Sequence, residues 1–130
     1  MTARDPLPFA KLMGLDITEV TPERVTAELK VRDYLCTRPA ILHGGAIMAF
    51  ADTVGAYATV GNLPEGATTT TIESKTNFFA AIPIGDTAYA ECTALHRGRT
   101  TMVWQTRVTR GDGKLCAMVT QTQLVLNREK

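Results

Sequence analysis

The residues best suited to chemistry in this sequence are a His-Gly-Gly at positions 43–45 and Asp52, nine residues after the histidine. They lie in an apolar, Ala-rich segment, residues 42–61, in which Asp52 is the one formally charged residue. The start of a helix offers unpaired backbone N–H groups and the positive end of the helix dipole to a developing anion. Gly44 lacks a Cβ, so a carbonyl group can approach its N–H closely. A carboxylate can attack a carbonyl carbon or activate water to do so. The pair predicts chemistry at an acyl carbonyl.

Asp52 has apolar neighbours, including Phe50 and Val54. A carboxylate in such surroundings is costly unless it is paired or hydrogen-bonded, and groups of this kind are candidates for catalysis. The alternative is an aspartate that only accepts hydrogen bonds from a neighbouring loop and stabilises the fold. Gly44 and Asp52 are eight positions apart, which is roughly 12 Å along a helix axis. Because a reacting centre must lie about 3 Å from each group, we expect Gly44 of one chain to act with Asp52 of another across a two-fold axis.

The segment 41–60 approaches the length of a membrane span, but its composition argues against one. It contains three glycines, a histidine and two threonines, and an aspartate near the bilayer centre costs roughly 2.5 to 3.5 kcal/mol. We therefore predict a helix that is apolar on all sides because protein surrounds it.

The remainder of the chain predicts strands that could wrap this helix. Residues 24–32 alternate apolar and polar side chains with the period of two expected for a half-buried strand. The Gly-Asp-Gly at 111–113 is a hairpin signal. The expected elements are a short helix at 9–13, strands at 14–20 and 24–32, the long helix, and strands at 67–81, 87–96, 100–110 and 114–127. This order predicts an α+β fold in which a curved antiparallel sheet of five to six strands packs around one central helix.

Length and composition limit the function. The 130 residues predict a single domain, 1–130, with its core at about 8–127. A net charge of +1 gives no reason to expect nucleic acid or a membrane as a partner. The three cysteines are widely spaced and predict reduced thiols and no metal site. The N-terminus lacks the pattern of a signal peptide, so a cytoplasmic protein is expected.

The segments LHGGAIMAFADTVGAYA, TTTIESKTNFFAAIPIGD and HRGRTTMVWQTRV resemble the hotdog-fold acyl-CoA thioesterases, over about residues 8–127. The branch concerned includes the phenylacetate-pathway (PaaI-like) thioesterases and the HGG-type 4-hydroxybenzoyl-CoA thioesterase. The resemblance implies hydrolysis of an acyl-CoA to a free acid and coenzyme A, at sites shared between the chains of a dimer or of a dimer of dimers. It implies no cofactor, because coenzyme A is part of the substrate.

The resemblance also assigns roles to individual residues. Asp52 is the base or nucleophile, and the Gly44 N–H is the oxyanion donor. His43 resembles the histidine that lines the carbonyl site, although capping of the helix is an alternative role. Thr71 falls where this branch often has a Ser or Thr that holds the attacking water or the acid, although it could be a plain strand residue. Gly45 is expected to bind substrate.

The turn at 96–101 matches the family's phosphate-binding turn for coenzyme A. Two arginines around a glycine, beside exposed N–H groups, suit phosphate, whereas the alternative is an ordinary charged hairpin. The acyl group is expected near the strand that carries Phe79, with Phe78 as the other possible lining residue. The binding residues predicted here are Arg97, Gly98, Arg99 and Thr100.

Two residues depart from the family pattern. Thr37 occupies the slot of an Asn or Gln that orients water or the substrate carbonyl, and Ala40 occupies that of a glycine. The substitution at Thr37 leaves open a second hypothesis, an acyl-CoA sensor or binding module without turnover. A third hypothesis is a hotdog enoyl-thioester hydratase or dehydratase, which needs a histidine paired with an acid.

Overall fold

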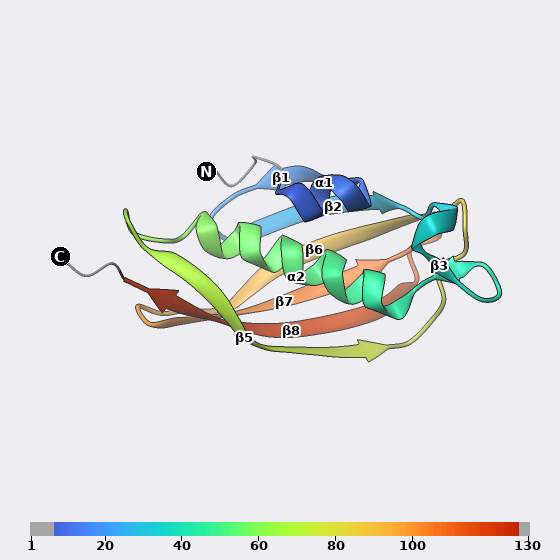
Figure 1. The fold of residues 1–130 in the computed structure, drawn as a ribbon. Coiled ribbons are helices and arrows are strands. Elements are labelled where there is room, and N and C mark those ends of the chain that lie inside the picture. The colour runs from blue at the N-terminus through green and yellow to red at the C-terminus, as the bar shows by residue number, and fades with distance from the viewer. Residues whose placement is uncertain (1–6, 128–130) are drawn as a thin grey trace.

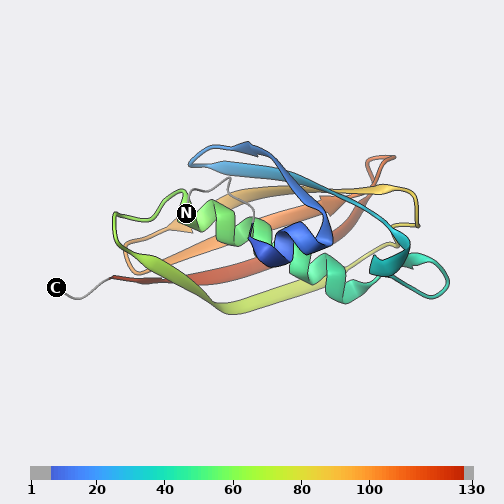
Figure 2. The ribbon, with the colours of Figure 1, turned by 45° about the horizontal axis from the view of Figure 1, so that its top comes forward.

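The computed structural model describes residues 7–127, in which a six-stranded antiparallel sheet curves around a central helix (Figures 1 and 2). The strand order is β1-β2-β6-β7-β8-β5, so β1 and β5 form the two edges. A separate pairing of β3 with β4 precedes the central helix. The predicted α+β architecture is confirmed, while η1, β3 and β4 were not predicted. The elements are α1 (Pro8–Met13), β1 (Leu15–Val20), β2 (Arg24–Lys30), η1 (Asp33–Leu35), β3 (Cys36–Thr37), β4 (Ile41–Leu42), α2 (Gly44–Val60), β5 (Thr68–Phe78), β6 (Thr87–Arg97), β7 (Thr101–Thr109) and β8 (Leu115–Leu126).

The inner face of the sheet is apolar because its strands alternate as the sequence predicts. In β2, Val25, Ala27 and Leu29 are at most 1% exposed, and the residues between them are half-buried. They join side chains of α2 and of the other strands in one hydrophobic cluster. Burial of each large aliphatic side chain contributes about 1.5 to 3 kcal/mol. The sheet therefore holds α2 in place along its whole length.

The central helix is less enclosed than expected. Phe50, Val54 and Ala58 are buried against the sheet, but Met48 is 41% exposed and Asp52 and Ala56 are only half-buried. The last three are spaced four apart, so they lie on one side of the helix. The prediction of burial on all sides is wrong for this single chain, because the sheet covers only one side of α2.

Cys92 gives the fold a pH dependence. Burial on the inner face of β6 raises the pKa of its thiol to about 11, against a partly opposing hydrogen bond with Thr106. As pH rises, the Cys92 thiol loses its proton at a lower pH in the unfolded chain than in the folded chain. Between about pH 9 and 11 the unfolded chain therefore binds fewer protons, and the free energy of unfolding falls as pH rises through that range. We expect the free energy of unfolding to fall by about 2 to 3 kcal/mol more in the unmodified protein than in Cys92→Ala. Urea denaturation at several pH values measures this, and parallel pH curves for the two proteins would contradict it.

Candidate functional site

Helix α2 begins with a side-chain cap from His43. Its backbone is extended, with φ −63° and ψ 138°, and its Nδ1 accepts a hydrogen bond from the Gly45 N–H at 2.8 Å. Because a backbone N–H can only donate, Nδ1 carries no proton, and a neutral His43 has its proton on Nε2. The capping role is thus observed. It leaves the exposed Nε2–H free to donate to a ligand.

The N–H of Gly44 is the free donor at this end of the helix. The N–H groups of Ala46 and Ile47 donate to the His43 carbonyl, and that of Gly45 donates to the His43 ring. Within residues 7–127, no acceptor is hydrogen-bonded to the Gly44 N–H. An N–H in this position, aided by the helix dipole, suits a developing oxyanion. The Gly45 N–H is already used by the cap.

A cavity of about 270 Å³ lies beside Gly44 and brings together residues that are far apart in the sequence. Thr37 and Phe79 line it, as does Phe78, whose Cζ would lie 3.4 Å from a Cβ added at Gly44. Both phenylalanines are more than half exposed. We call Thr37, Gly44, Phe78 and Phe79 the amide half-site.

The backbone of Ala40 has a conformation that is unusual for alanine. Its φ is +117°, a region that favours glycine over residues with a side chain, and holding alanine there costs about 1 to 3 kcal/mol. A glycine-favouring backbone at position 40 is consistent with the alignment that places Thr37 in the Asn/Gln slot.

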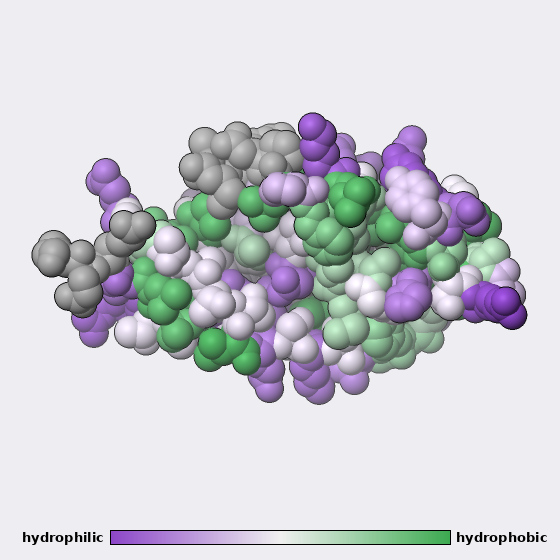
Figure 3. Space-filling view, in the orientation of Figure 1, coloured by the Kyte–Doolittle hydropathy of each residue, from purple (hydrophilic) through white to green (hydrophobic). Residues whose placement is uncertain are grey.

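A second, larger hollow of about 440 Å³ lies on the other side of the helix start. His43 and Gly45 line it together with apolar side chains of α1 and η1, among them Phe9 and Leu12. Both of these are strongly exposed, and Figure 3 shows hydrophobic surface over α1. The start of α2 thus lies between two largely apolar hollows.

Asp52 is held from the neighbouring strands. Its Oδ1 lies 3.2 Å from the hydroxyl of Thr71 on β5, and Gln121 Nε2 of β8 donates to it at 3.4 Å. The same Nε2 lies 3.4 Å from the Asp52 backbone carbonyl. Thr71 therefore does contact the acid, as the resemblance implies.

Sequence reasoning missed the buried glutamines of β8. Gln121 and Gln123 are at most 1% exposed and lie on the inner face, between Val119 and Val125. The alternation of the strand could have found them, because it places both on the apolar face. We call Asp52, Thr71, Gln121 and Gln123 the acid half-site.

Gly44 and Asp52, the central residues of the two half-sites, lie on one helix and are well separated. They are eight positions apart on α2, a separation of roughly 12 Å along the helix axis. Met48 lies between them on the uncovered side of the helix. One carbonyl group therefore cannot contact both groups of the same chain.

The predicted phosphate-binding turn lies at the opposite end of the molecule from Gly44 (Figure 1). Arg97 Nη1 donates to the Pro22 carbonyl at 3.2 Å and to Asn62 Oδ1 at 3.3 Å, next to the C-terminal end of α2. The Gly98 N–H donates to the Thr101 carbonyl, and the Thr100 carbonyl accepts from the Val125 N–H. Arg97, Arg99 and Thr100 are exposed. Within one chain, this turn is therefore far from the amide half-site, and it adjoins β8 near Gln123 of the acid half-site.

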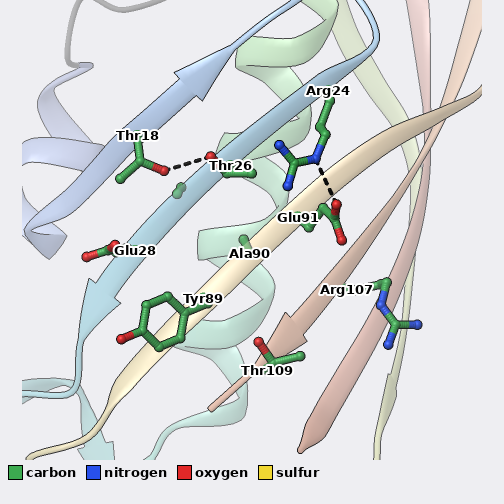
Figure 4. Close-up of a pocket in the computed structure, with 10 residues that line it drawn as sticks. Thr18, Arg24, Thr26, Glu28, Tyr89, Ala90, Glu91, Arg107 and Thr109 are labelled. Atoms are coloured by element: carbon green, nitrogen blue, oxygen red, sulfur yellow. Dashed lines mark hydrogen bonds and ion pairs between the residues drawn. The ribbon is translucent and has the colours of Figure 1, made fainter. Parts of the chain in front are cut away.

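The outer face of the sheet carries a separate depression of about 210 Å³ (Figure 4). Figure 4 shows α2 behind the strands that line it. Two of its charged lining residues, Arg24 and Glu91, form an ion pair with each other. None of the predicted site residues lines it.

Residues 7–127 contain no group of three or more His, Cys, Asp or Glu side chains that could hold a metal ion. No helix in the same range has the length and hydrophobicity required to cross a bilayer.

Residues 40–117 match the thioesterase superfamily, and the chain belongs to that family. The expected hotdog fold and the resemblance to PaaI-like thioesterases are thereby confirmed.

Individual relatives agree with this assignment. The chain is 31% identical over 133 residues to a Deinococcus radiodurans protein named "Putative esterase", covering 98% of this chain and 87% of that protein. The crystal structure of AziG from S. sahachiroi has a TM-score of 0.90 at 27% identity, covering 95% of this chain and all of AziG. Thioesterase HI1161 of Haemophilus influenzae has a TM-score of 0.85 at 27% identity, covering 92% and 82%.

Two other solved structures share the fold. The PaaI protein of the E. coli phenylacetic acid degradation operon has a TM-score of 0.84 at 22% identity, covering 92% of this chain and 84% of PaaI. The protein smu.793 of Streptococcus mutans, solved bound to acetyl-CoA, has a TM-score of 0.80 at 25% identity, covering 89% and 91%.

Proposed function

We propose that this chain is an acyl-CoA thioesterase that uses Gly44 as oxyanion donor and Asp52 as general base or nucleophile. The observation that carries the proposal is the free Gly44 N–H at the start of α2, on the same helix as a carboxylate held by Thr71. Membership of the thioesterase superfamily supports a hydrolase. The acetyl-CoA bound to smu.793 supports coenzyme A as part of the substrate.

The proposed site is shared between two copies of the chain. The separation of roughly 12 Å between Gly44 and Asp52 requires a second chain to bring an acid to each amide. The uncovered side of α2 and the edge strand β5 offer it a surface, where Ile72 is 57% exposed. In an antiparallel arrangement, the turn at 97–100 of one chain also approaches the Gly44 end of the other. We therefore propose a dimer, or a dimer of dimers, as the active form.

The reaction balances with water as the only co-substrate. If Asp52 acts as a base, it takes a proton from water while the oxygen attacks the thioester carbon, and the carbonyl electron pair moves to the oxygen that faces Gly44 N–H. Collapse of this intermediate breaks the C–S bond. The leaving thiolate takes the proton from Asp52, and a free acid and coenzyme A result.

The substrate contacts follow from the two ends of the site. The cavity beside Gly44, with Phe78 and Phe79, is proposed to hold the acyl group. His43 lines the hollow on the other side of the helix start, so its proposed donation from Nε2–H requires the thioester carbonyl to lie at the helix start, between the two hollows. Arg97 and Arg99, with Gly98 and Thr100, are proposed to bind phosphates of coenzyme A. Thr37 borders the cavity in place of an amide side chain. Gly45 is proposed to let the substrate approach the helix closely because it has no side chain, since its N–H already donates to His43 Nδ1.

Release of free thiol tests the proposal. We expect the purified protein to liberate coenzyme A from at least one member of a panel of short, long and aromatic acyl-CoAs, as measured with a disulfide reagent. Binding of acyl-CoA without thiol release would favour a sensor or binding module, to which the threonine at 37 lends support. Loss of enoyl absorbance without thiol release would favour a hydratase or dehydratase. Either result would contradict the proposed hydrolysis.

A further inference from the structure

Gln121 and Gln123, the two inward-facing glutamines of β8, are buried between the sheet and α2. Their amides are almost fully buried, and burying an amide is costly unless it is hydrogen-bonded. Gly55 of α2 makes the room, because a Cβ at this position would lie 2.3 Å from Gln121 Cδ. Glycine inside a helix costs about 1 kcal/mol relative to alanine. Packing alone does not explain why a glutamine, with glycine opposite it, is buried against the helix one turn from Asp52.

The orientation of the Gln121 amide follows from its neighbours. Its Nε2 lies within 3.4 Å of three oxygens, the Asp52 carbonyl, Asp52 Oδ1 and Gln123 Oε1. Its Oε1 is buried and has no hydrogen-bond partner among the described residues. Turning the amide over would place an oxygen against three acceptors. The N–H groups therefore point at Asp52 and Gln123.

The orientation of the Gln123 amide is set by the backbone. The Thr69 hydroxyl donates its only proton to the Leu124 carbonyl at 2.9 Å, so its oxygen must accept the bond from Gln123 Nε2 at 3.0 Å. Gln123 Oε1 consequently faces Thr71, with which it is in close contact. The Thr71 hydroxyl has one proton and two acceptors, Gln123 Oε1 and Asp52 Oδ1.

With the exception of Gln121 Oε1, the polar groups of this arrangement have hydrogen-bond partners in both protonation states of Asp52. When Asp52 is a carboxylate, the Thr71 hydroxyl donates to it, and Gln123 Oε1 is satisfied by Gln121 Nε2. When Asp52 carries a proton, that proton is donated to the Thr71 oxygen, and the Thr71 hydroxyl turns to Gln123 Oε1. Neither state leaves the Thr71 proton without an acceptor, which would otherwise cost about 1 to 3 kcal/mol.

We infer that Gln121 and Gln123 are positioning residues that control the protonation of Asp52 in opposite directions: Gln121 stabilises the carboxylate, and Gln123 stabilises the acid by accepting the Thr71 proton. The inference rests on the proposed function, in which Asp52 gains a proton from water and returns it to the leaving thiolate. Both glutamines act through Asp52 and Thr71 and need not touch the substrate.

Within residues 7–127, Asp52 forms no ion pair with a charged group, so the hydrogen bonds of Thr71, Gln121 and Gln123 control its protonation. The contacts to Asp52 from β5 and β8 come from Thr71 and Gln121. Glu73 and Lys75 of β5 are exposed. Cys92, on the inner face of β6, stays neutral below about pH 9, because burial raises the pKa of its thiol to about 11.

Replacement of each glutamine by methionine tests the inference, since the side chain keeps its length and loses its amide. We expect the ¹³C NMR signal of the Asp52 carboxyl, assigned by comparison with Asp52→Asn, to change at lower pH in Gln123→Met and at higher pH in Gln121→Met than in the unmodified protein. The acidic limb of kcat/KM should move the same way in each variant, with kcat reduced and KM little changed. Gln105→Met, on the outer face of β7, is the matched control and should shift neither.

Thr69→Val provides a second route if a methionine variant fails to fold. Without the Thr69 hydroxyl, the Gln123 amide is free to turn its nitrogen toward Thr71, so the titration should move in the direction of Gln123→Met. Shifts of the same sign in both methionine variants, or no shift in any of the three, would overturn the inference. The NMR titration does not depend on turnover. Absence of thioester hydrolysis would therefore contradict the proposed function alone, and the NMR titration would still test whether the glutamines control the protonation of Asp52.

Discussion

Asp52→Asn is expected to lower kcat for thioester hydrolysis by a factor of about 10² to 10⁴, the usual contribution of a general base. The amide oxygen can still accept the bonds from Thr71 and Gln121, so the fold should be retained. An asparagine can neither take a proton from water nor attack the thioester as a nucleophile. Thiol release under saturating acyl-CoA measures the effect, and circular dichroism and thermal melting verify the fold.

Asp16→Asn is the matched control for this substitution. Asp16 is an exposed carboxylate on β1 and lies in neither half-site. It should leave turnover unchanged. Near-normal hydrolysis by Asp52→Asn across the acyl-CoA panel would remove Asp52 from the mechanism, and with it the shared site.

A single turnover in ¹⁸O-labelled water separates the two proposed roles of Asp52. A nucleophile forms a transient anhydride, and its hydrolysis can leave the label in the aspartate. A general base delivers the label only to the product acid. Mass spectrometry of the peptide that contains Asp52 distinguishes the two results.

Much of the fold was predictable because it follows from local patterns. The alternation in residues 24–30 and the glycines of the 111–113 turn depend on neighbouring residues alone, and the structure has a strand and a hairpin there, with Gly113 at φ +88°. The long helix was predictable from its composition. Its uncovered side was not, because exposure depends on how far the sheet reaches around the helix.

The site was predictable only in part, for a similar reason. The contact between Thr71 and Asp52 was expected from the resemblance, and the structure has it. Gln121 and Gln123 were missed although their strand was correctly predicted, since a threonine-rich and glutamine-rich stretch gives no sign of its partners. Their contacts depend on the packing of β8 against α2 and on the absence of a side chain at Gly55.

Gly44→Pro is expected to lower kcat by a factor of about 10² to 10³, the usual effect of removing one oxyanion donor. Proline removes the N–H and adds a Cβ, which would meet the exposed Phe78 ring at 3.4 Å. Gly44 is the first residue of α2, where proline is readily accepted because its N–H takes no part in the helix. His43 already has the extended backbone that a residue before proline requires.

Gly44→Ala separates loss of the donor from the effect of added bulk. The alanine keeps its N–H, and its Cβ meets Phe78 Cζ at 3.4 Å, a contact that the exposed ring can relieve by a small rotation. We expect Gly44→Ala to retain most of kcat, while Gly44→Pro loses it with KM changed much less, because the lost bond forms mainly in the transition state. Equal losses in both variants would mean that space at Gly44 matters and its N–H does not. The oxyanion role would then pass to another donor at the helix start, of which His43 Nε2–H is the nearest in sequence.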